Sequence, residues 1–127
     1  MPVQVKNKLL EGSCHCGAVR LVISKPPNYL IKCNCSICRR LGALWAHYTL
    51  AMVSVEGHPQ NTSAYVWGEE TLKTIRCRTC GCATHWEALT PKAGAEVGVN
   101  MNNFDPRLLQ NTPIKTFDGA TTWTYLD

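Results

Sequence analysis

Eight cysteines carry the clearest chemical signal in this chain of 127 residues. They occur as three tight groups with the patterns C-x-C, C-x-C-x-x-C and C-x-x-C-x-C, and their positions are Cys14, Cys16, Cys33, Cys35, Cys38, Cys77, Cys80 and Cys82. A disulfide between cysteines only two residues apart would be strained. Two such thiolates can readily bind one tetrahedral ion. The spacing therefore favours metal ligands over a disulfide framework.

Two of the cysteine pairs are followed directly by a glycine. Cys14 and Cys16 precede Gly17, and Cys77 and Cys80 precede Gly81. Glycine allows the chain to turn tightly, so that backbone N–H groups can point at the thiolates. We expect these two pairs to form one closed site of four cysteines, which is typical of structural zinc.

The middle group offers Cys33, Cys35 and Cys38 from one short loop. Three protein ligands with an open fourth position are typical of a catalytic or ligand-binding zinc. In the alternative interpretation, Cys82 supplies a fourth thiolate and closes this second site as well.

The rest of the chain consists of short alternating segments separated by Gly, Pro and Asn. Strands are expected at residues 19–24, 43–50, 52–56, 64–67, 72–76, 84–88 and 96–101, and residues 29–32 lead into the middle cysteine group. Asp105 is a good N-cap for a helical turn that begins at Pro106. The pattern predicts a mainly β protein in which residues 1–127 form a single domain.

Composition restricts the location and the partners. No apolar run approaches the roughly 20 residues that span a bilayer, and residues 1–11 lack the apolar core of a signal peptide. We therefore expect a cytoplasmic protein with reduced thiols and no membrane partner. The formal charge of +4 falls to about +1 once one four-thiolate and one three-thiolate zinc site are counted.

The cysteine motifs and their neighbours resemble those of a known family. Residues 12–20, Gly-Ser-Cys-His-Cys-Gly-Ala-Val-Arg, resemble the opening motif of the glutathione-dependent formaldehyde-activating enzymes, a family that also includes centromere-protein-V-like proteins. Residues 33–40 and 76–81 are similar to its second and third motifs, although the family usually has an aromatic residue where Arg76 stands. Phe117, Asp118 and Gly119, with Trp123, are similar to its C-terminal segment.

The resemblance implies a β-tent fold with two zinc ions. It implies a structural zinc at the four ligands Cys14, Cys16, Cys77 and Cys80, and a second zinc at Cys33, Cys35 and Cys38. It also implies that the second zinc binds glutathione, or a similar thiol, and the S-hydroxymethyl adduct formed with formaldehyde. The expected activity is that of a carbon–sulfur lyase centred on this zinc.

Two other functions compete with this hypothesis. The first is a non-catalytic zinc-binding module for a protein or nucleic-acid partner. Nucleic acid is the less favoured partner, because the lysines are scattered and the charge is near zero after metal binding. The second is a metal carrier or redox sensor. The sequence indicates no oligomeric state.

The remaining candidate side chains have two interpretations each. His47 and His85 lie in expected strands and can act as an acid or base, or they can be simple packing residues. The aromatic residues can line a pocket or fill the core, and they are Trp45, Tyr48, Trp67 and Trp86. Four arginines near the cysteines can bind carboxylates or lie on a solvated surface, and they are Arg39, Arg40, Arg76 and Arg78.

Overall fold

The computed structural model describes residues 9–68, 70–92 and 94–127. Its smaller sheet has three antiparallel strands in the order β1-β2-β5, which are β1 (Leu10–Ser13), β2 (Arg20–Ile23) and β5 (Val53–Glu56). The turn between β1 and β2 carries Cys14 and Cys16.

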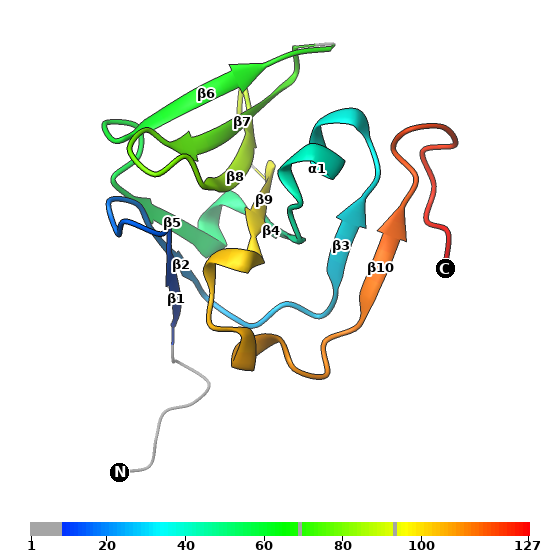
Figure 1. The fold of residues 1–127 in the computed structure, drawn as a ribbon, viewed down its shortest axis with the longest axis horizontal. Coiled ribbons are helices and arrows are strands. Elements are labelled where there is room, and N and C mark those ends of the chain that lie inside the picture. Colours follow the sequence, from blue (N-terminus) through cyan, green and yellow to red (C-terminus); the bar gives the residue numbers. More distant parts are fainter. Residues whose placement is uncertain (1–8, 69, 93) are drawn as a thin grey trace.

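The larger sheet has seven strands in the order β10-β3-β4-β9-β8-β7-β6. Their bounds are β3 (Leu30–Cys33), β4 (Trp45–Thr49), β6 (Thr62–Val66), β7 (Leu72–Cys77), β8 (Ala83–Ala88), β9 (Glu96–Asn100) and β10 (Ile114–Phe117). Strand β10 runs parallel to β3, and the other neighbours are antiparallel. Figure 1 shows β3 and β10 side by side, near the C-terminus.

The helical segments are short. They comprise α1 (Ser36–Leu41) and the 3-10 turns η2 (Leu50–Met52), η3 (Met101–Asn103) and η4 (Pro106–Leu109). As predicted, Asp105 caps η4, and its side chain accepts a hydrogen bond from the backbone N–H of Arg107. In the described part of the chain, no helix is long and apolar enough to cross a membrane.

The main core joins the two sheets. Alternate residues of β2, β4 and β9 point into it, together with Met101 and Phe104 from the segment after β9, and the strand residues include Leu21, Ile23, Ala46, Tyr48, Val97 and Val99. This period of two is the pattern that a half-buried strand requires. Burying each large apolar side chain contributes about 1.5–3 kcal/mol to folding.

The mainly β prediction is confirmed, although two details differ. The strand predictions missed β10 and also β1, which contains the weak strand formers Glu11 and Gly12. The middle cysteine group is not a simple loop, since Cys38 lies inside α1. The expectation that residues 1–11 carry no signal peptide falls mainly on residues 1–8, which lie outside the described residues.

Candidate metal centres

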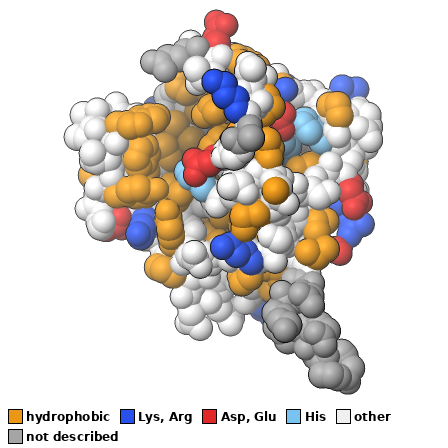
Figure 2. Space-filling view, turned by 180° about the vertical axis from the view of Figure 1, so that it is seen from behind, with side chains coloured by type: hydrophobic (Ala, Val, Ile, Leu, Met, Phe, Trp, Pro, Cys, Tyr) orange, Lys and Arg blue, Asp and Glu red, His pale blue; other side chains and the backbone are white. Residues whose placement is uncertain are grey.

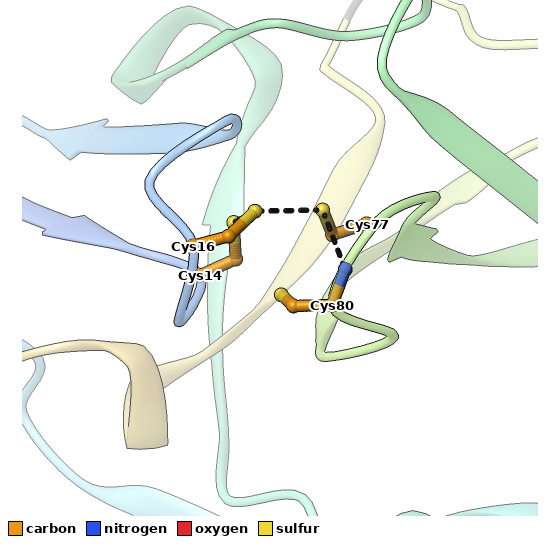
Figure 3. A group of neighbouring side chains, drawn as sticks. All are labelled: Cys14, Cys16, Cys77 and Cys80. Atoms are coloured by element: carbon orange, nitrogen blue, oxygen red, sulfur yellow. Dashed lines mark hydrogen bonds between the residues drawn. The ribbon is translucent and has the colours of Figure 1, made fainter.

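The first group joins the two sheets through four cysteines. Cys14 and Cys16 come from the β1–β2 turn, while Cys77 ends β7 and Cys80 lies in the turn toward β8. All four sulfur atoms lie within 4.8 Å of one another. Figure 3 shows the two turns facing each other with the sulfur atoms between them.

The sulfur separations in this group fit a tetrahedral zinc site. The Sγ atoms of Cys14 and Cys16 are 3.7 Å apart, and those of Cys16 and Cys77 are 3.6 Å apart. Four sulfurs at about 2.3 Å from a zinc ion are separated by about 3.8 Å. With these separations, and with all four sulfur atoms within 4.8 Å of one another, the four cysteines can hold one metal ion.

Backbone N–H groups surround these sulfurs. The N–H of Val19 donates to Cys14 Sγ at 3.4 Å, and the N–H groups of Thr79 and Cys80 donate to Cys77 Sγ at 3.4 and 3.5 Å. Such donors stabilise thiolates and tune bound metals. The backbone N–H of Cys82 similarly lowers the pKa of Cys80 to about 5. These backbone donors therefore favour deprotonated sulfur at Cys77 and Cys80.

The glycines act as the sequence predicted. Gly17 has φ 85° and Gly81 has φ 81°, which is the left-handed region that favours glycine. Each closes its turn through a backbone hydrogen bond, from Gly17 N to Cys14 O at 3.1 Å and from Gly81 N to Cys77 O at 3.0 Å. These turns bring the two cysteines of each pair to the same side.

The second group consists of Cys33, Cys35 and Cys38, whose sulfurs lie within 4.8 Å of one another. Cys33 ends β3, Cys35 caps the N-terminus of α1, and Cys38 lies one turn later in that helix. The N–H of Cys38 donates to Cys35 Sγ at 3.4 Å. A strand end, a cap and a helix turn thus direct three thiols to one point.

Two neighbours fix the surroundings of this second group. The indole N–H of the buried Trp45 donates to Cys38 Sγ at 3.3 Å. Gly119 approaches so closely that a Cβ atom there would lie 2.8 Å from Cys33 Sγ. Burial raises the pKa of the Cys38 thiol. A bound cation would offset this cost of forming the thiolate.

A buried carboxylate connects this group to the C-terminal segment. Asp118 accepts hydrogen bonds from Asn34 Nδ2 at 3.1 Å and from the N–H and hydroxyl of Thr122 at 3.1 and 2.8 Å. Asn34 Oδ1 in turn accepts from the N–H of Ala120 at 3.0 Å. These bonds lower the pKa of Asp118, with the Thr122 hydroxyl as the largest cause. The network holds the C-terminal turn against the second group, a role that the sequence analysis did not assign to Asn34.

Cys82 lies beside the first group. It packs against the hydrophobic cluster of Cys14, Val19 and Cys77, and its carbonyl accepts from Cys77 N–H at 2.9 Å. It joins neither sulfur group among the described residues. This placement gives no support to the alternative in which Cys82 completes the second site.

The other candidate side chains divide between core and surface. Trp45 and Tyr48 are buried, whereas Trp67 is exposed, and Trp86 packs over Gly98. Arg40 donates to Ser36 O at 2.7 Å and Arg78 to Thr62 O at 3.0 Å, so both stabilise local backbone. His15 and His47 are exposed. Within the described residues, none of these side chains completes a cysteine group.

The structure also reveals a third group that the sequence analysis missed. His58, His85 and Glu87 offer ligand atoms within 4.8 Å of one another. The hydrogen bond from His85 lowers the pKa of Glu87 to about 2, and burial lowers the pKa of His85. The sequence feature that could have predicted part of this group is the spacing of His85 and Glu87, because residues two apart on a strand share a face. His58 had no comparable signal.

Comparison with known proteins places this arrangement in a family. The family model described as "Glutathione-dependent formaldehyde-activating enzyme" matches residues 9–118. The chain therefore belongs to this family. A Halomonas elongata protein named "Putative glutathione-dependent formaldehyde-activating enzyme" is 64% identical over 33 residues, which cover 25% of this chain. That match spans only 21% of the relative's length.

A solved structure has a similar fold. The crystal structure of a Rhodobacter sphaeroides protein matches with a TM-score of 0.66 and 36% sequence identity. The match covers 83% of this chain and 99% of the other chain. The family, the mainly β fold and the cysteine groups compatible with metal thus agree with one another.

Proposed function

We propose that this protein binds glutathione, or a related thiol, together with its aldehyde adduct at a zinc ion held by Cys33, Cys35 and Cys38. The observation that carries the proposal is the three-thiol group, to which the described residues add no fourth protein ligand. Family membership over residues 9–118 supports a glutathione-dependent reaction with formaldehyde. The open position would accept the sulfur of the incoming thiol.

The proposed reaction makes or breaks one carbon–sulfur bond. The thiolate sulfur attacks the carbonyl carbon of the aldehyde, the C–S bond forms, and the electron pair of the C=O double bond moves to oxygen, which takes a proton from water. The reverse steps cleave the adduct. A zinc ion bound at this site would lower the pKa of a coordinated thiol, so that the thiol is deprotonated near neutral pH.

The chain's own residues position the reactants. Trp45 fixes Cys38 through its N–H···S hydrogen bond, and Gly119 lets the C-terminal turn pack closely against Cys33. Phe117 and Trp123 stack edge to face with centroids 5.1 Å apart, and Trp123 is 71% exposed. Figure 2 shows hydrophobic side chains gathered on the side of the molecule that carries β10, at the left of that view.

We also propose that zinc at Cys14, Cys16, Cys77 and Cys80 is structural. All four thiols are used, so that no position remains for a substrate. We infer a single domain for residues 1–127 and a cytoplasmic location, where glutathione keeps thiols reduced.

Cobalt substitution tests the proposed thiol site. Cobalt bound to thiolates absorbs light, and a new sulfur ligand changes this absorption. We expect added glutathione to change the spectrum of the cobalt-loaded protein, and S-methylglutathione, which has no free thiol, to leave it unchanged.

Two serine variants test whether the change in cobalt absorption arises at the second cysteine group. Cys38→Ser is expected to abolish the response to glutathione, because it removes one ligand of the second group. Cys82→Ser, the matched control, is expected to retain it. An unchanged spectrum of the wild-type protein at millimolar glutathione would contradict the proposal, and so would loss of the response in Cys82→Ser.

A further inference from the structure

The third polar group, formed by His58, His85 and Glu87, lies outside both cysteine groups. His85 and Glu87 are on β8, and His58 is in the turn between β5 and β6. The two imidazole rings meet edge to face with centroids 4.9 Å apart. The proposed thiol chemistry uses none of these side chains.

The inner atoms of the three side chains converge. His58 Nε2 lies 3.1 Å from Glu87 Oε1, and His85 Nε2 lies 2.8 Å from the same oxygen. Three ligands at about 2.0–2.1 Å from a tetrahedral zinc ion would be separated by about 3.3 Å. The two distances to Glu87 Oε1 are therefore a few tenths of an ångström short of this value, and all three ligand atoms lie within 4.8 Å of one another.

The outer atoms of the same side chains all have partners. His58 Nδ1 lies 2.7 Å from Thr62 Oγ1, and His85 Nδ1 lies 2.9 Å from Thr84 Oγ1. The second oxygen of Glu87 pairs with Lys73 Nζ at 3.3 Å. Metal-binding histidines and carboxylates typically have such outer partners, which fix their orientation.

The two threonines complete this outer layer. Thr62 Oγ1 donates to Pro59 O at 3.2 Å, and Thr84 Oγ1 donates to Ile75 O at 3.3 Å. With both hydroxyl protons used in this way, each threonine oxygen can accept a hydrogen bond from the Nδ1–H of its histidine. Each Nε2 is then left with a lone pair directed at the common point, which is the state that a metal requires.

We propose that His58, His85 and Glu87 form a third metal site, distinct from both cysteine groups, which binds zinc or a similar borderline divalent cation. Two imidazole nitrogens and one carboxylate oxygen suit zinc better than calcium or magnesium, which prefer oxygen ligands. The His85 side chain is 1% exposed, whereas the side chains of His58 and Glu87 are 17% and 22% exposed. The ion would thus enter from solvent and keep water in its fourth position.

The same side chains can also form a metal-free network. Each ring would then carry its proton on Nε2 and donate a hydrogen bond to Glu87. Each threonine hydroxyl would turn to donate a hydrogen bond to Nδ1. The two states differ in which ring nitrogen carries the proton, so the nitrogen spectrum of the histidines distinguishes them.

The test is a zinc titration of the full-length protein whose cysteine groups are already loaded with zinc. Histidine ring nitrogens are followed by long-range ¹H–¹⁵N NMR. We expect one further equivalent of zinc to shift the Nε2 signals of His58 and His85. In the zinc-bound state both rings should carry their proton on Nδ1. The exposed His15 and His47 serve as internal controls and should not shift.

Glu87→Gln separates metal binding from folding. A glutamine oxygen can still accept both Nε2–H hydrogen bonds, but it lacks the charge of a ligand, so that zinc affinity should fall at least about tenfold. Glu96→Gln makes the same change at an exposed position on the neighbouring strand β9 and should bind zinc as the wild type does.

Two outcomes would overturn the proposal. One is a titration in which His58 and His85 keep the proton on Nε2 at several equivalents of zinc. The other is equal zinc affinity in Glu87→Gln and the wild type. Neither outcome bears on the thiol site, whose readout is the cobalt–thiolate absorption and its response to glutathione.

Discussion

At Gly119 the absence of a side chain allows the C-terminal turn to approach the second cysteine group. A Cβ atom would lie 2.8 Å from Cys33 Sγ and 3.2 Å from Cys35 Cβ. Contacts below 3.0 Å force one of the two neighbours to move. Since both neighbours belong to the proposed zinc site, this glycine links the shape of the C-terminal turn directly to metal binding.

We predict that Gly119→Ala weakens metal binding at the second group by about tenfold, because it displaces a ligand. Competition with a chromophoric chelator measures the affinity. Gly68→Ala is the control, because it adds a Cβ in open space at φ 65°. It should cost about 1 kcal/mol of stability and leave metal affinity unchanged. Equal metal affinity in the two variants would show that Gly119 has no such role.

Tyr48 gives the core a measurable response to pH. Its hydroxyl donates to Lys25 O at 3.0 Å, and burial raises its pKa from 10.0 to about 12. The folded state thus favours the neutral phenol. The resulting stabilisation is complete below pH 10 and is lost as the pH rises toward 12.

We therefore predict that the wild type loses about 2 kcal/mol of unfolding free energy between pH 10 and 12 on account of this residue. In Tyr48→Phe that component should be absent, so the stability difference between the two proteins should narrow across this range. Urea unfolding at each pH measures it. A difference that stays constant from pH 9 to 12 would argue against the raised pKa.

At the scale of elements, the C-terminal turn is held to the β3–α1 junction by one carboxylate. Asn34 Oδ1 accepts from Ala120 N–H, so its amide nitrogen must face Asp118. An amide in place of that carboxylate cannot accept from Asn34 and Thr122 equally well, and one donor would be left facing another. The orientation of the Asn34 amide thus makes position 118 specific for aspartate.

Asp118→Asn is accordingly predicted to loosen the turn. Loss of hydrogen bonds to a charged acceptor should speed hydrogen exchange of the Ala120 and Thr122 amides by about tenfold or more. Exchange followed by NMR measures this directly. Asp105→Asn removes an exposed helix-capping carboxylate and should leave these two amides unchanged. If both variants exchange alike at these positions, the network does not hold the turn.

At the scale of the whole molecule, the first cysteine group connects the three-stranded and seven-stranded sheets. Cys16 and Cys77 are 61 residues apart in sequence, whereas the second group lies within the segment from Cys33 to Cys38. A metal that closes a long loop restricts the unfolded chain more than one that closes a short loop. The first group should therefore dominate global stability.

Cys77→Ser is predicted to lose one metal ion and to lower the melting temperature by about 10 °C or more. Cys35→Ser should lose one ion with a smaller effect on melting, and Cys82→Ser should lose none. Elemental analysis and calorimetry measure the two quantities. A larger melting shift in Cys35→Ser than in Cys77→Ser would refute this division of roles.

The sequence by itself determined the local chemistry. The C-x-C and C-x-x-C spacings, each followed by glycine, fix which thiols share a turn, because turn geometry depends on a few adjacent dihedral angles. Alternation likewise predicted β2, β4 and β9, since the period of two follows from strand geometry. Asp105 was recognisable as a cap for the same local reason.

Only the tertiary structure decided which distant segments meet. Cys82 stays beside the first group because its carbonyl pairs with Cys77 N–H. Strand β10 lies parallel to β3, and this pairing brings Asp118 to Asn34. His58 meets His85 and Glu87 across separate elements. These contacts depend on how the strands pair and how the two sheets pack around the shared core, which no local spacing in the chain specifies.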